Sequence, residues 1–219
     1  MDKTLPAIEL GASREDAELT VILMHGLGAD GHDFADVGEA YAVAAEPRKW
    51  RFVLPHAPAI PVTINQGMVM PAWYDILDMI QPREVDWGTV AASRASVESL
   101  LAAELAPKVV LAGFSQGAAM ALDVGLRNQE KVAGILVMSG YLLESETQPC
   151  PAKTAADFPI GMFHGSADPM VRLAAAEGAA ATLESKGYSA SLKIYPDVEH
   201  SLCEEEVRDV FAWLEEVAG

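Results

Sequence analysis

The sequence predicts a single α/β domain in which a mainly parallel, twisted sheet carries helices on both faces. Short apolar segments alternate along the chain with longer segments of helical spacing, which is typical of parallel strands joined by helical crossovers. Hydrophobic residues make up 51% of the 219 positions, enough to fill one core. No linker or internal repeat divides the chain, so residues 1–219 are expected to form one domain.

Six segments are expected to form the strands of the sheet. Each is a short apolar run with β-branched or aromatic residues, as is typical of buried strands. In chain order they are Leu19–Met24, Arg51–Leu54, Lys108–Ala112, Val132–Met138, Pro159–Phe163 and Ser191–Tyr195. Right-handed crossovers between parallel strands bring the loops that follow these strands to one edge of the sheet, where functional residues are expected.

Four segments are expected to be helical. Asp86–Leu105 has its apolar residues on one side, and Val171–Lys186 is rich in alanine and ends before Gly187. The helix after Ser115 has almost no polar side and should be buried. The last helix places five apolar residues opposite a Glu-rich face: Val207, Val210, Phe211, Leu214 and Val217.

The pentapeptide Gly113-Phe114-Ser115-Gln116-Gly117 is the most informative motif of the chain. It fits the G-x-S-x-G pattern, in which a serine occupies a strained turn between a strand and a helix. A predicted strand precedes it, and the alanine-rich residues after it favour a helix. Ser115 is therefore predicted to be a catalytic nucleophile; a glycine-rich turn without chemistry is the alternative.

The serine needs a base to accept its proton, and in this type of site the chain order is serine, acid, histidine. His200 lies between the last predicted strand and the last helix, where a loop can bring its imidazole to the serine. His164 also follows Ser115, but it precedes the candidate acid and so breaks the order. His200 is therefore the predicted base; an exposed loop histidine is the alternative.

Asp168 is the predicted acid because it follows the strand Pro159–Phe163, at the edge where the serine is expected. Its role would be to hold one tautomer of the histidine and to stabilise the charged imidazole. A helix N-cap is the alternative role for this residue. The competing carboxylates are Asp157, which precedes the strand, and Asp197 and Glu199, which lie beside His200 in the chain.

Two backbone N–H groups are expected to stabilise a tetrahedral oxyanion. Gln116 supplies one, because it directly follows the nucleophile. Leu27 supplies the other, because Gly26 and Gly28 give the loop after Leu19–Met24 the freedom to turn this amide toward the site. A phosphate cradle is the alternative, but neither a Walker A pattern nor G-x-G-x-x-G is present. His25 is expected to brace this loop.

The stretch from Pro55 to Pro82 interrupts the alternation of strands and helices. Its five prolines exclude a long helix, and its many apolar residues indicate that it packs against something. An irregular apolar excursion of this size is more often a functional cover than a passive connection. We interpret it as a wall or partial lid of an acyl-binding groove in which Met70 and Trp73 contact the substrate; core packing is the alternative for each residue.

Composition excludes several other classes of protein. The 15 basic and 32 acidic residues give a net charge of −17, and the basic ones form no stripe, so nucleic-acid binding is not expected. No apolar run is long enough to span a membrane and no signal peptide is evident, so a cytoplasmic location without integral membrane association is expected. The two cysteines, Cys150 and Cys203, indicate neither a disulfide framework nor a metal cluster.

The sequence resembles the small carboxylesterases and acyl-protein thioesterases, known as the phospholipase/carboxylesterase family. The matching segments run in family order from about residue 20 to the C-terminus. They are His25–Asp30, Pro55–Pro58, Pro61–Asn65, Met70–Asp75, Gly113–Gly117, His164-Gly165 with Asp168-Pro169, and His200-Ser201. One departure is Ala118, where family members often carry a third glycine.

The resemblance implies a compact α/β hydrolase without a large cap, which cleaves carboxylic esters or thioesters without a cofactor. It implies the triad Ser115, Asp168 and His200, with Leu27 and Gln116 as oxyanion donors, and it makes a weak homodimer plausible. The main expectation is a broad small-ester carboxylesterase. The alternative is an acyl-protein thioesterase or lysophospholipase acting on long acyl chains; a hydrolase-fold binding protein without activity is a third reading.

Overall fold

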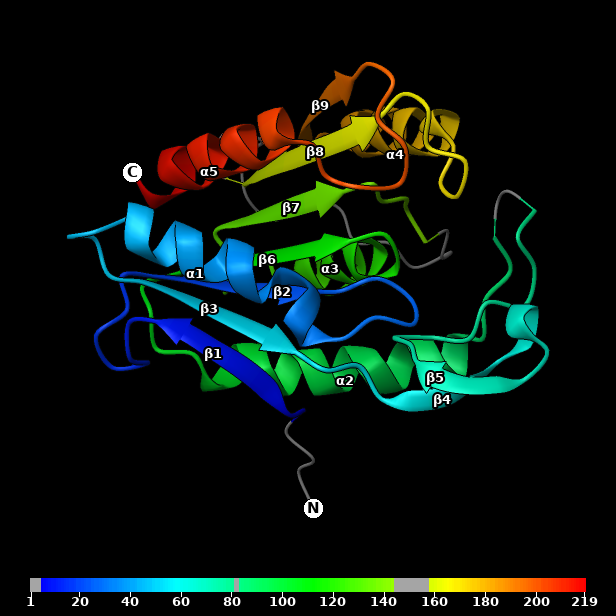
Figure 1. The fold of residues 1–219 in the computed structure, drawn as a ribbon, viewed down its shortest axis with the longest axis horizontal. Helices are drawn as coiled ribbons and strands as arrows, with labels where there is room; N and C mark the ends of the chain where they lie inside the picture. Colours follow the sequence, from blue (N-terminus) through cyan, green and yellow to red (C-terminus); the bar gives the residue numbers. More distant parts are fainter. Residues whose placement is uncertain (1–4, 81–82, 144–157) are drawn as a thin grey trace.

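The computed structural model describes residues 5–80, 83–143 and 158–219. Its centre is a seven-stranded sheet with the order β1-β3-β2-β6-β7-β8-β9 (Figure 1), in which β1 alone is antiparallel to its neighbour. The strands are β1 (Ala7–Gly11), β2 (Leu19–Met24), β3 (Trp50–Pro55), β6 (Lys108–Phe114), β7 (Gly134–Met138), β8 (Pro159–Gly165) and β9 (Ser189–Tyr195). The mainly parallel sheet of the prediction is confirmed.

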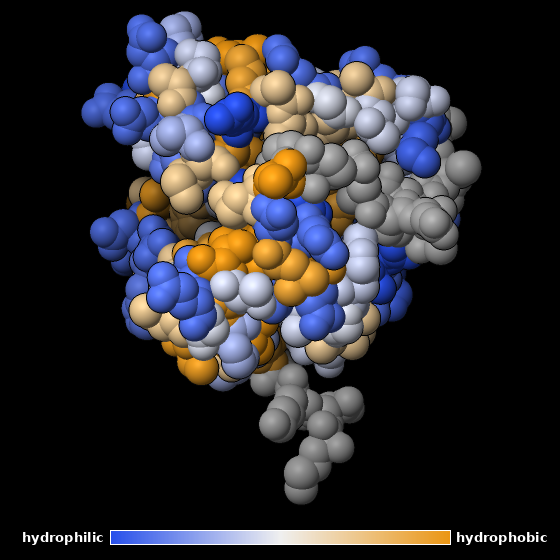
Figure 2. All heavy atoms as spheres, turned by 90° about the vertical axis from the view of Figure 1, so that its right-hand side faces the viewer, coloured by the Kyte–Doolittle hydropathy of each residue, from blue (hydrophilic) through white to orange (hydrophobic). Residues whose placement is uncertain are grey.

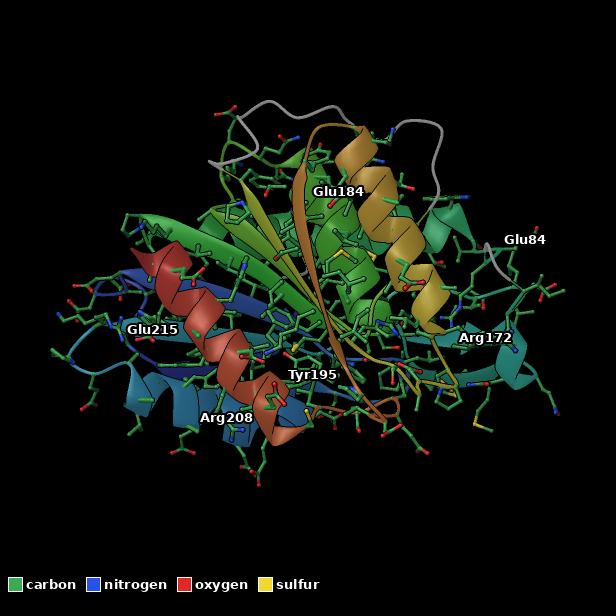
Figure 3. The ribbon with its side chains drawn as sticks, turned by 90° about the horizontal axis from the view of Figure 1, so that it is seen from above. Glu84, Arg172, Glu184, Tyr195, Arg208 and Glu215 are labelled. Atoms are coloured by element: carbon green, nitrogen blue, oxygen red, sulfur yellow. The ribbon has the colours of Figure 1, made fainter. Side chains whose placement is uncertain are left out.

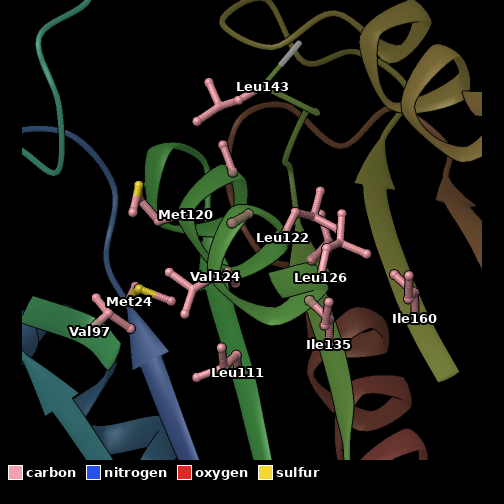
Figure 4. Packing of buried hydrophobic residues seen from close by; sticks show 14 of the residues in the cluster. Met24, Val97, Leu111, Met120, Leu122, Val124, Leu126, Ile135, Leu143 and Ile160 are labelled. Carbon is pink, nitrogen blue, oxygen red and sulfur yellow. The ribbon is translucent and has the colours of Figure 1, made fainter. Parts of the chain in front are cut away.

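The helices cover both faces of this sheet (Figure 1). One face packs against α1 (Ala35–Ala44) and α5 (Glu204–Ala218), and the other packs against α2 (Trp87–Ala103), α3 (Gln116–Arg127) and α4 (Leu173–Ser185). Two hydrophobic cores result, one on each side of the strands. Figure 4 shows the second core, where α3 lies over β6 and β7.

Helix α3 is buried along nearly its whole length, as its lack of a polar side predicts. Every residue from Gln116 to Leu126 is buried. Gly125 makes this close packing possible, since a Cβ there would lie 2.6 Å from the side chain of Ile135 on β7. The helix that begins within the Gly113–Gly117 turn, which we call the elbow, is therefore held rigidly against the sheet.

All six predicted strands are present, and the sequence analysis missed two elements at the N-terminal side. Strand β1 is an edge strand with no fully buried residue, so it has no strong apolar pattern. Helix α1, which follows a short 3-10 turn (Gly31–Phe34), buries only Gly38 and Tyr41. Both elements are defined by tertiary contacts rather than by local pattern.

The stretch from residue 55 to residue 82 is more regular than expected. It contains a two-stranded antiparallel hairpin, β4 (Ala59–Val62) and β5 (Met68–Pro71), joined by a 3-10 turn, Thr63–Asn65. The turn closes through Gln66 (φ 60°) and Gly67 (φ 76°). Its prolines are tolerated because every strand of a two-stranded ribbon is an edge strand, which can leave backbone groups unpaired. Pro82 lies outside the described residues.

None of the helices in the described ranges combines the length and the hydrophobicity that a membrane crossing requires.

The first turn of α5 contains a buried carboxylate. Glu206 is 0% exposed, and neither carboxylate oxygen has a hydrogen-bond partner among the described residues. Burial and the nearby charge of Asp209 raise the pKa of Glu206 to about 7, while its backbone N–H donates to the Cys203 sulfur 3.4 Å away. Tyr41 and Tyr195 also lie close enough that this carboxylate raises their pKa. Glu206 is therefore protonated in the folded protein at mildly acidic pH.

We predict that Glu206→Gln stabilises the protein at pH 8 and has little effect at pH 4. The pKa is raised in the folded chain, so stability falls as pH increases from the ordinary value of 4.5 to about 7, and glutamine removes this loss. This loss in the free energy of unfolding, once the pH is above both pKa values, amounts to about 3 kcal/mol. Urea unfolding at both pH values measures it. Glu204→Gln, at an exposed position of the same helical turn, is the control; equal gains in both variants would contradict the prediction.

Candidate active site

Ser115 occupies a strained turn between β6 and α3. Its φ of 54° and ψ of −116° are unusual for a residue with a side chain. A Cβ on Gly113 would lie 2.3 Å from the carbonyl carbon of Gly117, and one on Gly117 would lie 2.2 Å from the Met24 oxygen. The two glycines of the motif are thus required by contact with backbone atoms, and the turn lifts the serine out of the end of the sheet.

The structure brings together the three residues predicted as a triad. Nε2 of His200 lies 2.9 Å from Oγ of Ser115, and Nδ1 of His200 lies 2.6 Å from Oδ2 of Asp168. Because an ionised carboxylate only accepts, Nδ1 carries the proton and Nε2 is free to accept from the serine hydroxyl. Asp168 has no exposed carboxylate surface, whereas the His200 side chain is 19% exposed.

The competing acids do not contact His200 in this way. Asp197 turns its backbone into the left-handed region, with φ 58°, and its N–H donates to the Ser166 hydroxyl. Asp157 lies outside the described residues. Asp168 is not the N-cap of α4, because that helix begins at Leu173 with Arg172 at the N-cap position. Of the described carboxylates considered, only Asp168 therefore has the geometry of the acid.

Each oxygen of the Asp168 carboxylate has a separate task. Oδ2 faces His200, while Oδ1 accepts from the N–H groups of Met170 and Val171, both at 2.8 Å. His164 holds the same loop, since its Nε2 donates to the Val171 carbonyl at 2.8 Å. Burial lowers the pKa of His164, so this ring is neutral. The loop that carries the acid is thus fixed from two sides.

The His200 loop is held by packing that the sequence analysis missed. The ring of Phe114, the second residue of the elbow, lies 4.7 Å from the imidazole between ring centroids. The loop is also pinned to the end of β8, because a Cβ on Gly165 would lie 2.2 Å from the Val198 oxygen. The glycine after His164 therefore allows the acid loop and the base loop to pass each other closely.

Leu27 and Gln116, the predicted oxyanion donors, both line the cavity beside Ser115. Among the described residues, neither backbone N–H has a hydrogen-bond acceptor. The loop of Leu27 is held from both sides: the Gly28 N–H donates to the Pro71 carbonyl at 2.9 Å, and Nε2 of the buried His25 accepts from the Ala57 N–H at 3.0 Å. Burial lowers the pKa of His25, which keeps this ring neutral for its bracing role.

The side chain of Gln116 has a structural role that the motif does not reveal. Its Oε1 accepts from the Trp73 N–H at 2.8 Å, and its Nε2 donates to the Tyr74 carbonyl at 2.7 Å. Gln116 is buried, so these two bonds replace hydration that the amide and the backbone have both lost. The elbow is thereby attached to the segment that follows the hairpin.

The predicted substrate contact of Trp73 is corrected by the structure. Trp73 is 0% exposed and does not line the cavity. Its indole N–H donates to the His25 carbonyl at 2.8 Å, and its ring packs 5.3 Å from the His25 imidazole. The physical reason is that the segment after the hairpin turns this side chain inward, where it supports the loop of Leu27 through the His25 carbonyl.

A cavity of about 490 Å³ opens beside Ser115, within the range of small-molecule sites. Its lining is mainly apolar, and the stretch from residue 55 to residue 82 contributes one wall. That wall consists of Ile64, Asn65, Met70, Ile76 and Met79. Met70 thus lies where the sequence analysis places a substrate contact. Figure 2 shows hydrophobic side chains gathered on this face of the molecule.

One group of possible metal ligands lies in the described part of the chain: Asp30, His32 and His56. Their hydrogen bonds already explain the arrangement. Nδ1 of His32 lies 2.8 Å from Oδ1 of Asp30, and Nδ1 of His56 accepts from the Gly31 N–H at 3.2 Å. These residues brace the oxyanion loop and are not part of the Ser115 cluster. Cys150 lies outside the described residues.

The fold and the serine elbow define the class as an α/β hydrolase. The model of the phospholipase/carboxylesterase family matches residues 5–218, and the chain belongs to this family. Acyl-protein thioesterase 1 of Neurospora crassa is 38% identical over 90% of this chain and 86% of the relative, and that of Gibberella zeae is 36% identical over 95% and 94%. The crystal structure of Zea mays acyl-protein thioesterase 2 superposes with a TM-score of 0.82 at 25% identity, covering 98% of this chain and 99% of that chain.

We predict that Asp168→Asn lowers kcat about 10³- to 10⁴-fold, because an amide at this position no longer fixes the His200 tautomer. Initial rates on p-nitrophenyl butyrate measure the loss, and circular dichroism verifies the fold. Asp197→Asn is the matched control, since asparagine tolerates the left-handed backbone of residue 197. Equal activity of the two variants would exclude Asp168 as the acid.

We predict that Trp73→Phe lowers the free energy of unfolding by about 2 kcal/mol, because it leaves the buried His25 carbonyl without a donor. Since Trp73 does not reach the cavity, KM for a short ester should change much less than in Met70→Ala, which alters the cavity wall. Urea titration and steady-state kinetics separate the two effects. A larger KM change in Trp73→Phe than in Met70→Ala, with unchanged stability, would instead support a direct contact between Trp73 and the substrate.

Proposed function

We propose that this protein is a serine hydrolase that releases acyl groups from thioesters and carboxylic esters through an acyl-enzyme intermediate. The hydrogen-bonded chain from Ser115 through His200 to Asp168 is the observation that carries the proposal. A strained elbow and two neighbouring backbone amides without acceptors support it. No cofactor is needed, because these groups supply the nucleophile, the proton carrier and the anion stabilisation.

In the first half-reaction, the Ser115 hydroxyl attacks the acyl carbonyl while Nε2 of His200 removes its proton. The buried Asp168 carboxylate, held by two backbone N–H groups, stabilises the imidazolium that forms. The oxyanion accepts hydrogen bonds from the Leu27 and Gln116 amides. Loss of the thiol or alcohol, after proton transfer from His200, leaves the acyl group on the serine.

In the second half-reaction, His200 activates a water molecule that attacks the acyl-enzyme. The same two amides stabilise the second oxyanion, and collapse of the intermediate returns the proton to Ser115. The apolar wall of the cavity holds the acyl chain during both steps. Met70 is the cavity residue that we assign to this contact.

An acyl thioester is favoured over a broad range of small esters as the preferred substrate. The relatives at 36–38% identity, which align over nearly the whole chain, are named acyl-protein thioesterase 1. These names support the alternative of the sequence analysis more than its main expectation. The mainly apolar cavity of about 490 Å³ agrees with an acyl chain of more than a few carbons. A cytoplasmic location, expected from the sequence, and a weak homodimer, which the family resemblance implies, are part of this proposal.

We predict that the wild-type protein hydrolyses a long-chain acyl thioester with a higher kcat/KM than p-nitrophenyl acetate, and that Ser115→Ala loses both activities. The reason for the first preference is burial of the chain in the apolar cavity, which contributes about 0.8 kcal/mol per methylene. The measurement uses p-nitrophenyl esters from acetate to palmitate together with S-octanoyl and S-palmitoyl thioesters of N-acetylcysteamine.

Labelling with a fluorophosphonate provides the control for this experiment. The reagent should attach to Ser115 in the wild type and to no residue in the Ser115→Ala protein, which should keep its circular dichroism spectrum. If p-nitrophenyl acetate gave the highest kcat/KM, a small-ester carboxylesterase would be favoured over a thioesterase for long acyl chains. Turnover retained by a clean Ser115→Ala preparation would exclude the proposed mechanism.

A further inference from the structure

Two arginines, one in the cavity of Ser115 and one in the hollow next to it, differ from all the other arginines of the chain. The chain has eight arginines and an excess of acidic residues, 32 against 15 basic ones. Six arginines form ion pairs with carboxylates: Arg14, Arg48, Arg51, Arg94, Arg127 and Arg208. Among the described residues, Arg83 and Arg172 have no such partner. With so many carboxylates available, two unpaired guanidinium groups at one place call for an explanation.

Arg83 lines the cavity that contains Ser115, and it is the one arginine or lysine of that lining in the described chain. Its guanidinium group is held by a backbone carbonyl and an aromatic ring, neither of which cancels its positive charge. Nη2 donates to the Met170 carbonyl at 2.6 Å, and the group lies 4.4 Å from the centroid of the Tyr141 ring. Tyr141 is 3% exposed, and its hydroxyl is 2.6 Å from that of Tyr74, so the ring is a rigid support.

Most of the donors of Arg83 are unused. A guanidinium carries five N–H bonds, and only the one to Met170 has an acceptor in the described chain. The acidic residues nearest in sequence, Asp78 and Glu84, form no ion pair with it. Among the described residues, the one carboxylate that lines the same cavity is the exposed Asp33, in the 3-10 turn Gly31–Phe34. The positive charge of Arg83 is therefore available to a molecule in the cavity.

Arg172 extends this positive charge outward. It borders a second hollow, of about 580 Å³, whose other walls are Met79, Ile80, Pro169 and Met170. Met79 and Met170 line both hollows, so the two lie next to each other. Figure 3 shows Arg172 at the same end of the molecule as Glu84, the chain neighbour of Arg83, and far from Arg208 on α5. Each of the two neighbouring hollows thus combines apolar side chains with one arginine.

We propose that Arg83, with Arg172 outside it, forms an anion subsite that binds a carboxylate or phosphate group carried by the substrate. This inference rests on the proposed function and specifies its substrate class: acyl esters or thioesters with an anionic group, on the acyl chain or on the leaving group. A planar guanidinium stacked on an aromatic ring presents paired N–H donors that match such oxygens. The methionine and isoleucine walls hold the apolar part of the same molecule.

The net charge of −17 makes this local charge necessary for such a substrate. The surrounding field repels an anion, so binding depends on a nearby cation that faces the groove. Arg83 is partly exposed, so salt should weaken the interaction. Preference for anionic substrates is thus expected to decline between low and high ionic strength, whereas hydrolysis of neutral substrates should show no such decline.

The test measures kcat/KM for matched anionic and neutral substrates. The acyl arm pairs mono-p-nitrophenyl suberate and sebacate with p-nitrophenyl octanoate and decanoate, chains long enough that the carboxylate does not attack its own ester. The leaving-group arm pairs S-octanoyl coenzyme A with S-octanoyl-N-acetylcysteamine. Each arm yields one ratio, anionic over neutral, for the wild type, Arg83→Gln, Arg172→Gln and Arg208→Gln. Arg208→Gln removes the same charge at a site far from the groove.

We expect Arg83→Gln to lower the ratio about five- to tenfold in at least one arm, and Arg172→Gln to lower it less. Arg208→Gln should leave both ratios unchanged. A lower ratio for the suberate and sebacate esters indicates that the bound anionic group lies on the acyl chain. A lower ratio for the coenzyme A thioester indicates that it lies on the leaving group. The proposal is overturned if Arg83→Gln lowers anionic and neutral rates equally, which would make Arg83 only a support for the Asp168 loop, or if Arg208→Gln has the same effect.

A binding measurement separates this proposal from the proposed hydrolysis. Octyl phosphate is titrated by calorimetry into the Ser115→Ala protein and into Ser115→Ala combined with Arg83→Gln, where no turnover occurs. Weaker binding to the double variant, about five- to tenfold, supports the subsite whether or not the enzyme cleaves the chosen esters. Equal binding to both overturns it. Retained ester hydrolysis in Ser115→Ala would instead count against the catalytic mechanism alone.

Discussion

The close contact between the start of α3 and the end of β2 is the constraint on which the rest of the site depends. Gly117 lies so near the Met24 and His25 carbonyls that any side chain would overlap with backbone atoms. This contact fixes the turn at Ser115 and forces its backbone into a conformation with φ 54°. It also sets the Gln116 amide beside the loop of Leu27, because both begin where the two neighbouring strands end. One packing contact therefore positions the proposed nucleophile and both proposed oxyanion donors.

A buried polar network connects the elbow with the cover of the groove. Gln116 binds the backbone on both sides of the Trp73–Tyr74 peptide, and Trp73 binds the His25 carbonyl. His25 in turn accepts from Ala57, at the beginning of the same stretch. Since each of these hydrogen bonds is buried, loss of one leaves a polar group with neither a protein partner nor water to bind. The cavity wall and the catalytic turn thus behave as one rigid unit, which is what pre-organised anion stabilisation requires.

The arginines of the described chain are paired with carboxylates except where the substrate is expected. Six arginines are neutralised by carboxylates, and the two that are not lie along one groove. The two buried histidines near the site are neutral, because burial lowers the pKa of both His25 and His164. They shape loops without adding charge near Asp168. His200, by contrast, contacts both Ser115 and Asp168.

The sequence by itself determined the six parallel strands of the sheet, the helix after the elbow, and the meeting of Ser115, His200 and Asp168. These follow from local causes: apolar runs that must be buried, glycines where a Cβ does not fit, and a fixed order of motifs at strand ends. Only the tertiary structure decided that Trp73 points inward, that the proline-rich stretch contains a hairpin, and that β1 and α1 complete the fold. It also brought Arg83 and Arg172, which are far apart in the chain, to one groove. A local pattern records which residues avoid water, but not which neighbour covers them, and side-chain direction in an irregular segment depends on that neighbour.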